Sequence, residues 1–176
     1  DSLLTITINP IVGINYLKNG NRDLTHRYVG AETHAYAGKH LGLYTSLRDN
    51  NFKDLLSSPS YLNKYEGGNY KFSKYGNDYS EMRGGIFYSW KWGHLGLAKD
   101  HFVWGNNYNG SNIFSGHSPS FAHLKFNIKP TLWIELNYVH GWLVSELSDS
   151  SRSYNYGYGI RNTFRNKFLA ANMVTI

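Results

Sequence analysis

A stretch rich in amides, hydroxyls and aromatic rings holds the side chains best suited to binding chemistry. It reads WGNNYNGSNIFSGH from Trp104 to His117. A Trp or Tyr ring can stack on the C–H face of a sugar while neighbouring amide groups bond the sugar's hydroxyls. The candidate sugar-binding residues are Trp104, Asn106, Asn107, Tyr108, Asn112 and His117. The alternative is a loop that folds inward and satisfies its own backbone with its Asn side chains. Asp100 and Gly105 beside it are candidate structural anchors for this loop.

Patterns for catalysis or metal binding are weak in this chain. The segments Ser111–Asn112 and Ser115–His117 supply the residue types of a Ser-His-Asn phospholipase, but they lie in one loop without the strand placement such a triad needs. The 8 His residues show no HExxH spacing. His26 and His34 share a strand face but lie about 26 Å apart at strand rise. There is no Cys for thiolate chemistry or disulfides. We expect no enzyme, no metal site and no cofactor.

Strands are the elements that must position this loop. From Phe121 to Glu146 the sequence alternates between apolar and polar residues, which places each set on one face of a hairpin. One face holds Ala122, Leu124, Phe126 and Ile128, and the other holds His123, Lys125, Asn127 and Lys129. Because Pro cannot donate to a strand ladder, we expect the turn at Pro130–Thr131.

The same alternation recurs along the chain and predicts eight strands. They separate into hairpins with short turns at Gly38, Gly93 and Pro130, and long polar connections near residues 49–80, 101–120 and 147–165. Short turns at one end and long loops at the other are typical of outer-membrane barrels. Strand patterns of about nine to thirteen residues also exceed the usual five or six of soluble strands and suit a tilted membrane strand.

Composition is compatible with two classes of β protein. Charged residues make up 17% of the 176 residues, and aromatic residues make up 16%. Low charge with many Tyr and Trp residues suits transmembrane barrels with aromatic girdles, and also carbohydrate-binding β domains. The net charge of +6 indicates either a solvated basic surface or attraction for anionic polysaccharide or lipopolysaccharide. No nucleic-acid-binding motif appears, and no apolar run is long enough for a transmembrane helix.

Two further sets of residues have alternative interpretations. Charged residues and histidines on the polar face of the predicted strands either pair with one another in a filled lumen or line a transport path. They are Glu32, His34, Arg48, Arg83, Lys91, His123, Lys125, Lys129 and Glu135. Clustered tyrosines are either polysaccharide contacts or an aromatic girdle with loop packing; they are Tyr61, Tyr65, Tyr70, Tyr75, Tyr154, Tyr156 and Tyr158.

Residues 98–146 contain a distinctive series of features: Asp100 at the end of a Gly-Leu strand, Trp104–Gly105 before a Gly/Asn loop, Ser115, Ser118–Pro119 and the hairpin from Phe121. With these features the segment resembles the Wzi-type capsule assembly family of outer-membrane barrels, most closely its Bacteroidetes branch with the gliding-motility protein RemB. The resemblance implies a bacterial outer-membrane barrel of about eighteen strands. It also implies a lectin-like role in anchoring capsular polysaccharide, or a role in surface adhesion and gliding.

The sequence therefore predicts an all-β fold, an antiparallel transmembrane β-barrel with up-and-down meander topology. We expect residues 1–176 to be a single segment of a longer barrel that contributes about eight strands. The expected function is non-catalytic attachment or assembly of surface polysaccharide, or cell-surface gliding and adhesion. The expected partners are outer-membrane lipid and lipopolysaccharide, surface polysaccharide and other envelope proteins. The alternatives are a channel or transporter, a component of an envelope secretion or motility complex, and a soluble glycan-binding sandwich.

Overall fold

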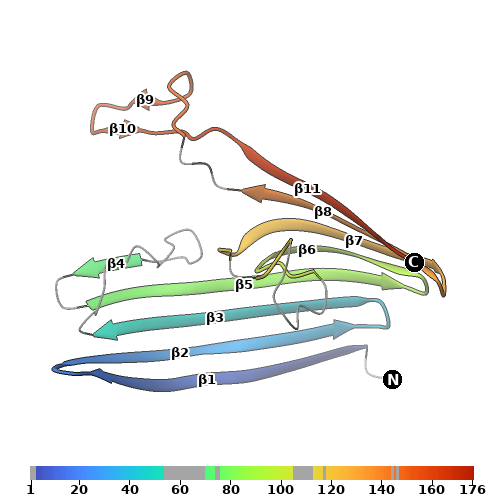
Figure 1. Ribbon diagram of the computed structural model, residues 1–176, viewed down its shortest axis with the longest axis horizontal. Helices are drawn as coiled ribbons and strands as arrows, with labels where there is room; N and C mark the ends of the chain where they lie inside the picture. The colour runs from blue at the N-terminus through green and yellow to red at the C-terminus, as the bar shows by residue number, and fades with distance from the viewer. Residues whose placement is uncertain are drawn as a thin grey trace.

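Eight long strands and one short strand form one antiparallel sheet, and two further short strands form a separate hairpin (Figure 1). The computed structural model describes residues 3–53, 70–73, 76–104, 113–116, 118–143, 145 and 147–176. The long strands are β1 (Leu4–Asn19), β2 (Arg22–Ala37), β3 (Leu41–Lys53), β5 (Gly76–Trp90), β6 (Gly93–Asp100), β7 (Phe121–Thr131), β8 (Ile134–Leu143) and β11 (Lys167–Thr175). The short ones are β4 (Tyr70–Ser73), β9 (Tyr154–Asn155) and β10 (Ile160–Arg161). In this part of the chain no helix is long and apolar enough to cross a membrane.

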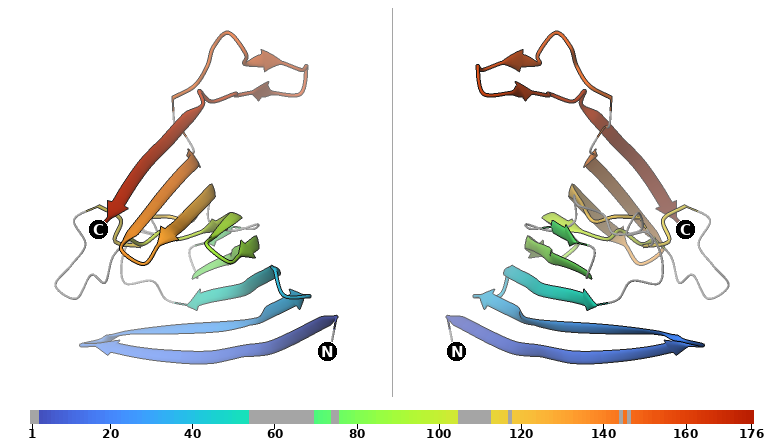
Figure 2. Two further views of the ribbon diagram at one scale, coloured as in Figure 1. Left: turned by 90° about the vertical axis from the view of Figure 1, so that its right-hand side faces the viewer. Right: turned by 90° about the vertical axis from the view of Figure 1, so that its left-hand side faces the viewer.

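The topology is a meander in which each long strand pairs with the next one along the chain. The strand order is β1-β2-β3-β5-β6-β7-β8-β11, with β4 paired to β5 outside this path and β9 paired to β10 in a separate small hairpin. The predicted all-β, antiparallel meander of eight strands is therefore confirmed. Among the described strands, β1 and β11 form the two edges and do not pair with each other, so the sheet is open (Figure 2). Closure into a barrel stays a prediction.

The two faces of the sheet differ in chemistry. Residues paired across an antiparallel ladder share a face, and the register aligns one row across the sheet: Ile6, Ala35, Leu43, Ile86, Leu97 and Leu124. We call the side that carries this row the apolar face. The opposite side, the polar face, carries Ser46, Arg48, Arg83, His123 and Lys125. The alternation predicted for the hairpin from Phe121 is confirmed.

The buried core lies against the polar face rather than the apolar one. On the apolar face, Ile6 is 56% exposed and Leu97 is 50% exposed. Burial is concentrated where Phe102 and Trp104 pack with Val139 of β8. The loop after β6 therefore folds over the polar side of β7, β8 and β11. This is the reverse of a soluble sheet, which buries its apolar side.

Strand boundaries differ from the predicted ones in two places. Strands β3 and β5 extend into residues 49–80, where the sequence predicts a loop, because their polar outer side chains bond across the ladder: Asn51 donates to Asp78 (2.5 Å). Pro130 is not in a turn. It lies within β7 beside a register irregularity between Ile128 and Thr131, and the turn follows at residues 132–133. A bulge is one of the few strand positions that tolerates the missing Pro N–H.

Candidate functional site

Charged groups on the polar face are paired across neighbouring strands. Arg48 of β3 lies 3.7 Å from Glu81 of β5, and its guanidinium lies 5.2 Å from the centre of the Tyr28 ring. Farther along the sheet, Asn127 donates to the carboxylate of Glu135 (2.7 Å) and to Asn137 (2.8 Å). These contacts place opposite charges or amide donors beside each charged group, although Arg48 Nε and Glu81 Oε2 have no hydrogen-bond partner within the described residues. They favour mutual pairing over a transport path for this part of the predicted set.

The other charges of that set are distributed over the same side. Glu32 and His34 on β2 lie on the polar face, as do Arg83 and His123. Lys125 lies with its ammonium 6.0 Å from the centre of the Phe102 ring. The remaining two lysines, Lys91 and Lys129, are exposed near the short turns.

Asp100 occupies the position expected of a loop anchor. It is the last residue of β6, and its carboxylate accepts a hydrogen bond from the Tyr44 hydroxyl and lies 3.7 Å from the Arg83 guanidinium. The same carboxylate accepts the backbone N–H of His101 (2.7 Å), the first residue of the loop. One side chain therefore joins β3, β5 and the start of the loop. Gly105, the second predicted anchor, lies outside the described residues.

Trp104 is buried in the aromatic cluster beneath the loop. It is 8% exposed, and its ring makes edge contacts with Phe102 and Phe114 at centroid distances of 5.5 and 5.3 Å. Its backbone N–H donates to the carbonyl of Phe114 (3.2 Å). This position corresponds to the inward-folded alternative and leaves no open ring face for a sugar at Trp104. The other candidates, Asn106, Asn107, Tyr108, Asn112 and His117, lie outside the described residues, so sugar binding by this loop stays a prediction.

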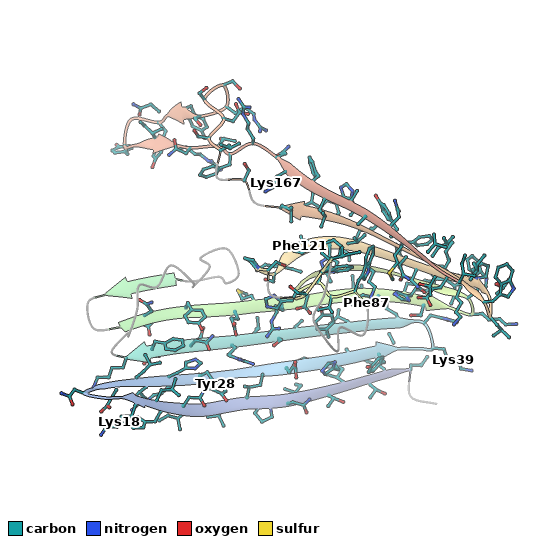
Figure 3. The ribbon with its side chains drawn as sticks, viewed as in Figure 1. Lys18, Tyr28, Lys39, Phe87, Phe121 and Lys167 are labelled. Atoms are coloured by element: carbon teal, nitrogen blue, oxygen red, sulfur yellow. The ribbon has the colours of Figure 1, made fainter. Side chains whose placement is uncertain are left out.

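Glycines on the polar face lie under aromatic rings, a pattern that sequence reasoning missed. Tyr28 covers its register partner Gly13, Tyr44 covers Gly85, and Phe87 covers Gly96. A glycine in a strand interior often marks such a close approach. The sequence signal is a glycine on the polar parity, but the covering ring is identifiable only once the register is known. Tyr28 and Phe87 can be located in Figure 3.

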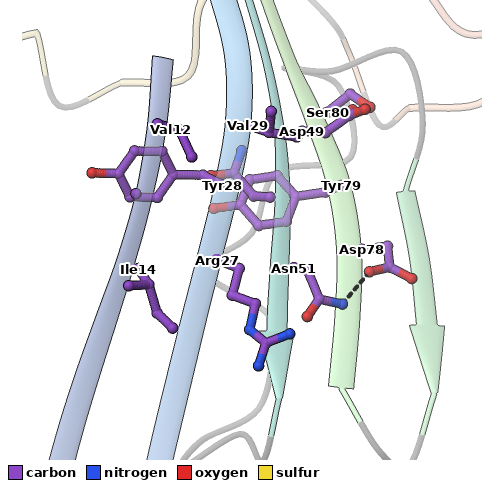
Figure 4. Close-up of a pocket in the computed structure, with 12 residues that line it drawn as sticks. Val12, Ile14, Arg27, Tyr28, Val29, Asp49, Asn51, Asp78, Tyr79 and Ser80 are labelled. Carbon is purple, nitrogen blue, oxygen red and sulfur yellow. Dashed lines mark hydrogen bonds between the residues drawn. The ribbon is translucent and has the colours of Figure 1, made fainter.

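The apolar face ends abruptly toward the long-loop end of the sheet. A shallow pocket of about 750 Å³ lies there, lined by Val12, Ile14, Val29, Arg27, Asp49, Asn51, Asp78 and Ser80 among others (Figure 4). Ser80 donates to Asp49 (2.5 Å), and Asn51 donates to Asp78. Polar pairs therefore replace apolar rows on β3 and β5 at this level.

Exposed tyrosines lie on the small hairpin beyond β8. Tyr154 and Tyr156 are more than half exposed, and Tyr158 is 98% exposed. The hairpin tip is closed by the Tyr156 N–H, which donates to the carbonyl of Gly159 (3.1 Å). These tyrosines are exposed rather than packed into the loop, and polysaccharide contact and an aromatic girdle both stay predictions for them. The side chains of the second tyrosine cluster, Tyr61, Tyr65, Tyr70 and Tyr75, lie outside the described residues.

Comparisons with protein-family models, with curated proteins and with solved structures find no match to this chain. Membership of the Wzi-type family therefore stays a prediction that depends on residues 98–146 and on the strand pattern.

Proposed function

We propose that this chain is a membrane-embedded section of a bacterial outer-membrane β-barrel, of the Wzi/RemB type, that holds polysaccharide at the cell surface without catalysing a reaction. The observation that carries the proposal is the exposed apolar face. Four rows on β1, β2, β3 and β5 contain no charged residue on this side, from Leu4 to Pro10 on β1 and from Met82 to Tyr88 on β5. The part of the sheet described offers no protein layer to cover them.

Contact with lipid lowers the free energy of this exposed apolar face relative to contact with water. Removing one Leu or Ile side chain from water is worth about 1.5–3 kcal/mol, and large apolar residues are exposed on every long strand except β7. The polar boundary at Arg27, Asp49 and Asp78 then corresponds to the headgroup level, because a charge facing the bilayer centre costs about 2–4 kcal/mol and little near the interface.

The polar face supports a filled rather than an open lumen. The pairs of Arg48 with Glu81 and of Arg83 with Asp100 neutralise charge, and the Phe102–Trp104 cluster lies over β7, β8 and β11. A channel needs a hydrated path past such groups. A non-conducting barrel that presents its outer loops to a glycan is the function that these contacts favour, and bilayer conductance measurements separate it from the channel alternative.

Membrane embedding is testable with single-cysteine variants, because the chain has no Cys of its own. Ile6→Cys and Leu43→Cys place a fluorophore on the apolar face, and Thr7→Cys and Ser46→Cys are matched controls on the polar face of the same strands. After reconstitution, brominated lipids should quench only the first pair. Equal quenching of both pairs, or a stable detergent-free monomer, would overturn the embedding.

The same faces predict which substitutions block assembly. Phe126→Arg puts a charge on the apolar face and should prevent the heat-modifiable folded form on a gel, whereas Lys125→Ala on the polar face should retain it. Binding of the reconstituted protein to acidic and neutral polysaccharides tests the glycan role directly. Failure to bind any glycan, with embedding intact, would leave a structural or motility role.

A further inference from the structure

A basic pocket lies where β6, β7, β8 and β11 end on the long-loop side. Its volume is about 1060 Å³, which is room for more than a single sugar ring. Its basic lining residues are Lys99, Arg165 and Lys167. Among the described residues that line it there is no carboxylate.

Hydrogen bonds hold the basic residues at this place. The backbone N–H of Arg165 donates to the carbonyl of Leu147 (2.9 Å), and that of Asp149 donates to the carbonyl of Thr163 (2.6 Å), so the segment after β8 returns as a ladder to the pocket. Lys99 is tied to β5 through its ammonium, which donates to the carbonyl of Met82 (3.2 Å). Arg165 and Lys167 have exposed side chains.

Two acidic groups near the pocket along the chain, Asp149 and Asp100, are engaged elsewhere. The Asp149 carboxylate accepts from the Arg152 guanidinium (2.7 Å) and from the Ser151 hydroxyl (2.6 Å). Asp100, next to Lys99, is bonded to Tyr44 and paired with Arg83. Neither Asp149 nor Asp100 lines the pocket, so neither neutralises its basic residues there. Glu146, between the lining residues Ser145 and Leu147, lies outside the described residues.

The rest of the lining combines hydroxyl and amide groups with apolar side chains such as Phe121, Leu143 and Leu169. Serine hydroxyls and the Asn166 amide supply donors and acceptors, and Trp142, 42% exposed, supplies an aromatic surface. Rings that stack on C–H faces and amides that bond hydroxyls are the elements of saccharide recognition. The exposed tyrosine hairpin extends from the same segment, between Ser148 and Phe164, which pair with each other.

We propose that this pocket binds an acidic sugar unit of a surface polysaccharide, with Arg165 and Lys167 binding the acid group and Trp142 contacting the ring. Arg is suited to bidentate pairing with a carboxylate, and Lys adds a point charge. The site rests on the proposed polysaccharide role and narrows it to anionic glycans such as polyuronates. The serine hydroxyls, the Asn166 amide and the ring of Trp142 are the lining groups that favour a saccharide over an anionic lipid headgroup.

The test measures binding of oligogalacturonate and of neutral dextran fragments of equal size to the full chain in detergent micelles. The double variant Arg165→Gln/Lys167→Gln should bind oligogalacturonate at least about tenfold more weakly, since two charge-assisted hydrogen bonds are lost. The control Lys18→Gln/Lys39→Gln removes the same charge at two turns far from the pocket and should stay within about twofold of the wild type. Trp142→Phe should be tolerated better than Trp142→Ala.

The possible outcomes distinguish failure of the proposed binding pocket from failure of the proposed polysaccharide role. Equal loss in both double variants would show nonspecific charge attraction and overturn the site. Wild-type binding of dextran as strong as of oligogalacturonate, unchanged in the variants, would overturn the site and keep the polysaccharide role. Binding only to vesicles that contain phosphatidylglycerol would assign the pocket to lipid and overturn it. Binding to no glycan at all would remove the polysaccharide role itself.

Discussion

The ring of Phe87 occupies the space that a side chain at Gly96 would need. These two residues are register partners on β5 and β6, and a Cβ at position 96 would lie 2.2 Å from Cδ1 of Phe87. The same ring lies near Gly85 and stacks on Tyr44 at a centroid distance of 5.9 Å. The ring therefore has neighbours on several sides and little room to move.

Gly96→Ala should destabilise the sheet by about 1–3 kcal/mol, because overpacking forces the ring off its rotamer. Gly42→Ala is the matched control: it also faces an aromatic partner, Tyr36, but its Cβ would meet that ring at an ordinary 3.7 Å. Its cost should be below about 0.5 kcal/mol. Urea unfolding from lipid vesicles measures both. Equal costs would show that the ring moves freely.

Trp104→Ala should destabilise the folded protein by about 3–5 kcal/mol, because it removes a buried ring from the cluster with Phe102 and Val139. Trp104→Phe keeps an aromatic ring and should retain most of the stability. Unfolding curves and glycan binding of the folded fraction are measured together. If Trp104→Ala stays as stable as the wild type but loses glycan binding, the sugar-stacking hypothesis is correct and the buried position is not the functional one.

Asp100→Asn should weaken the start of the loop more than the sheet. It removes the charge that faces Arg83 and leaves one acceptor oxygen where the carboxylate accepts from both the Tyr44 hydroxyl and the His101 N–H. Since Asp100 and Arg83 are about a quarter exposed, we expect a loss of only about 1–2 kcal/mol. Hydrogen exchange should accelerate at residues 101–104. Asp78→Asn, which alters an exposed pair with Asn51, is the control and should leave that segment unchanged.

Asp149 should make the hairpin after β8 sensitive to acid. Hydrogen bonds from Ser151 and then from Arg152 lower the pKa of its carboxyl from 3.8 to about 2. A depressed pKa stabilises the fold fully above the unfolded value, and this contribution is lost as the pH falls toward about 2. A spin label at Ser150→Cys should become mobile only below about pH 4. In Asp149→Asn the label should be mobile at every pH.

The positions of the strands and the face on which each side chain lies were predictable because apolar and polar residues alternate along each strand. Leu43 and Leu47 alternate with Tyr44, Ser46 and Arg48, so only one pleated arrangement separates them. The extensions of β3 and β5 were not predictable from apolar alternation, since Asp49, Asn51 and Asp78 are polar on the outer side. Their strand character depends on bonds across the ladder.

The site was less accessible to sequence reasoning. An aromatic residue in an amide-rich loop has the same local sequence whether its ring meets a sugar or a protein core. The burial of Trp104 depends on Phe114 in the same loop and on Val139 in β8, which only the fold brings together. The basic pocket likewise combines Lys99 with Arg165, residues far apart in the chain whose common position depends on the meander.

The β1 edge has a consequence for how this protein must be handled and made. From Leu4 to Leu17 the strand has no charged side chain, and none of the described strands pairs with its outer edge. Soluble sheets protect such edges with lysines, prolines or bulges, because an open ladder recruits strands from other molecules. Only Pro10 interrupts this one. An unpaired β1 edge in water is therefore a template for aggregation.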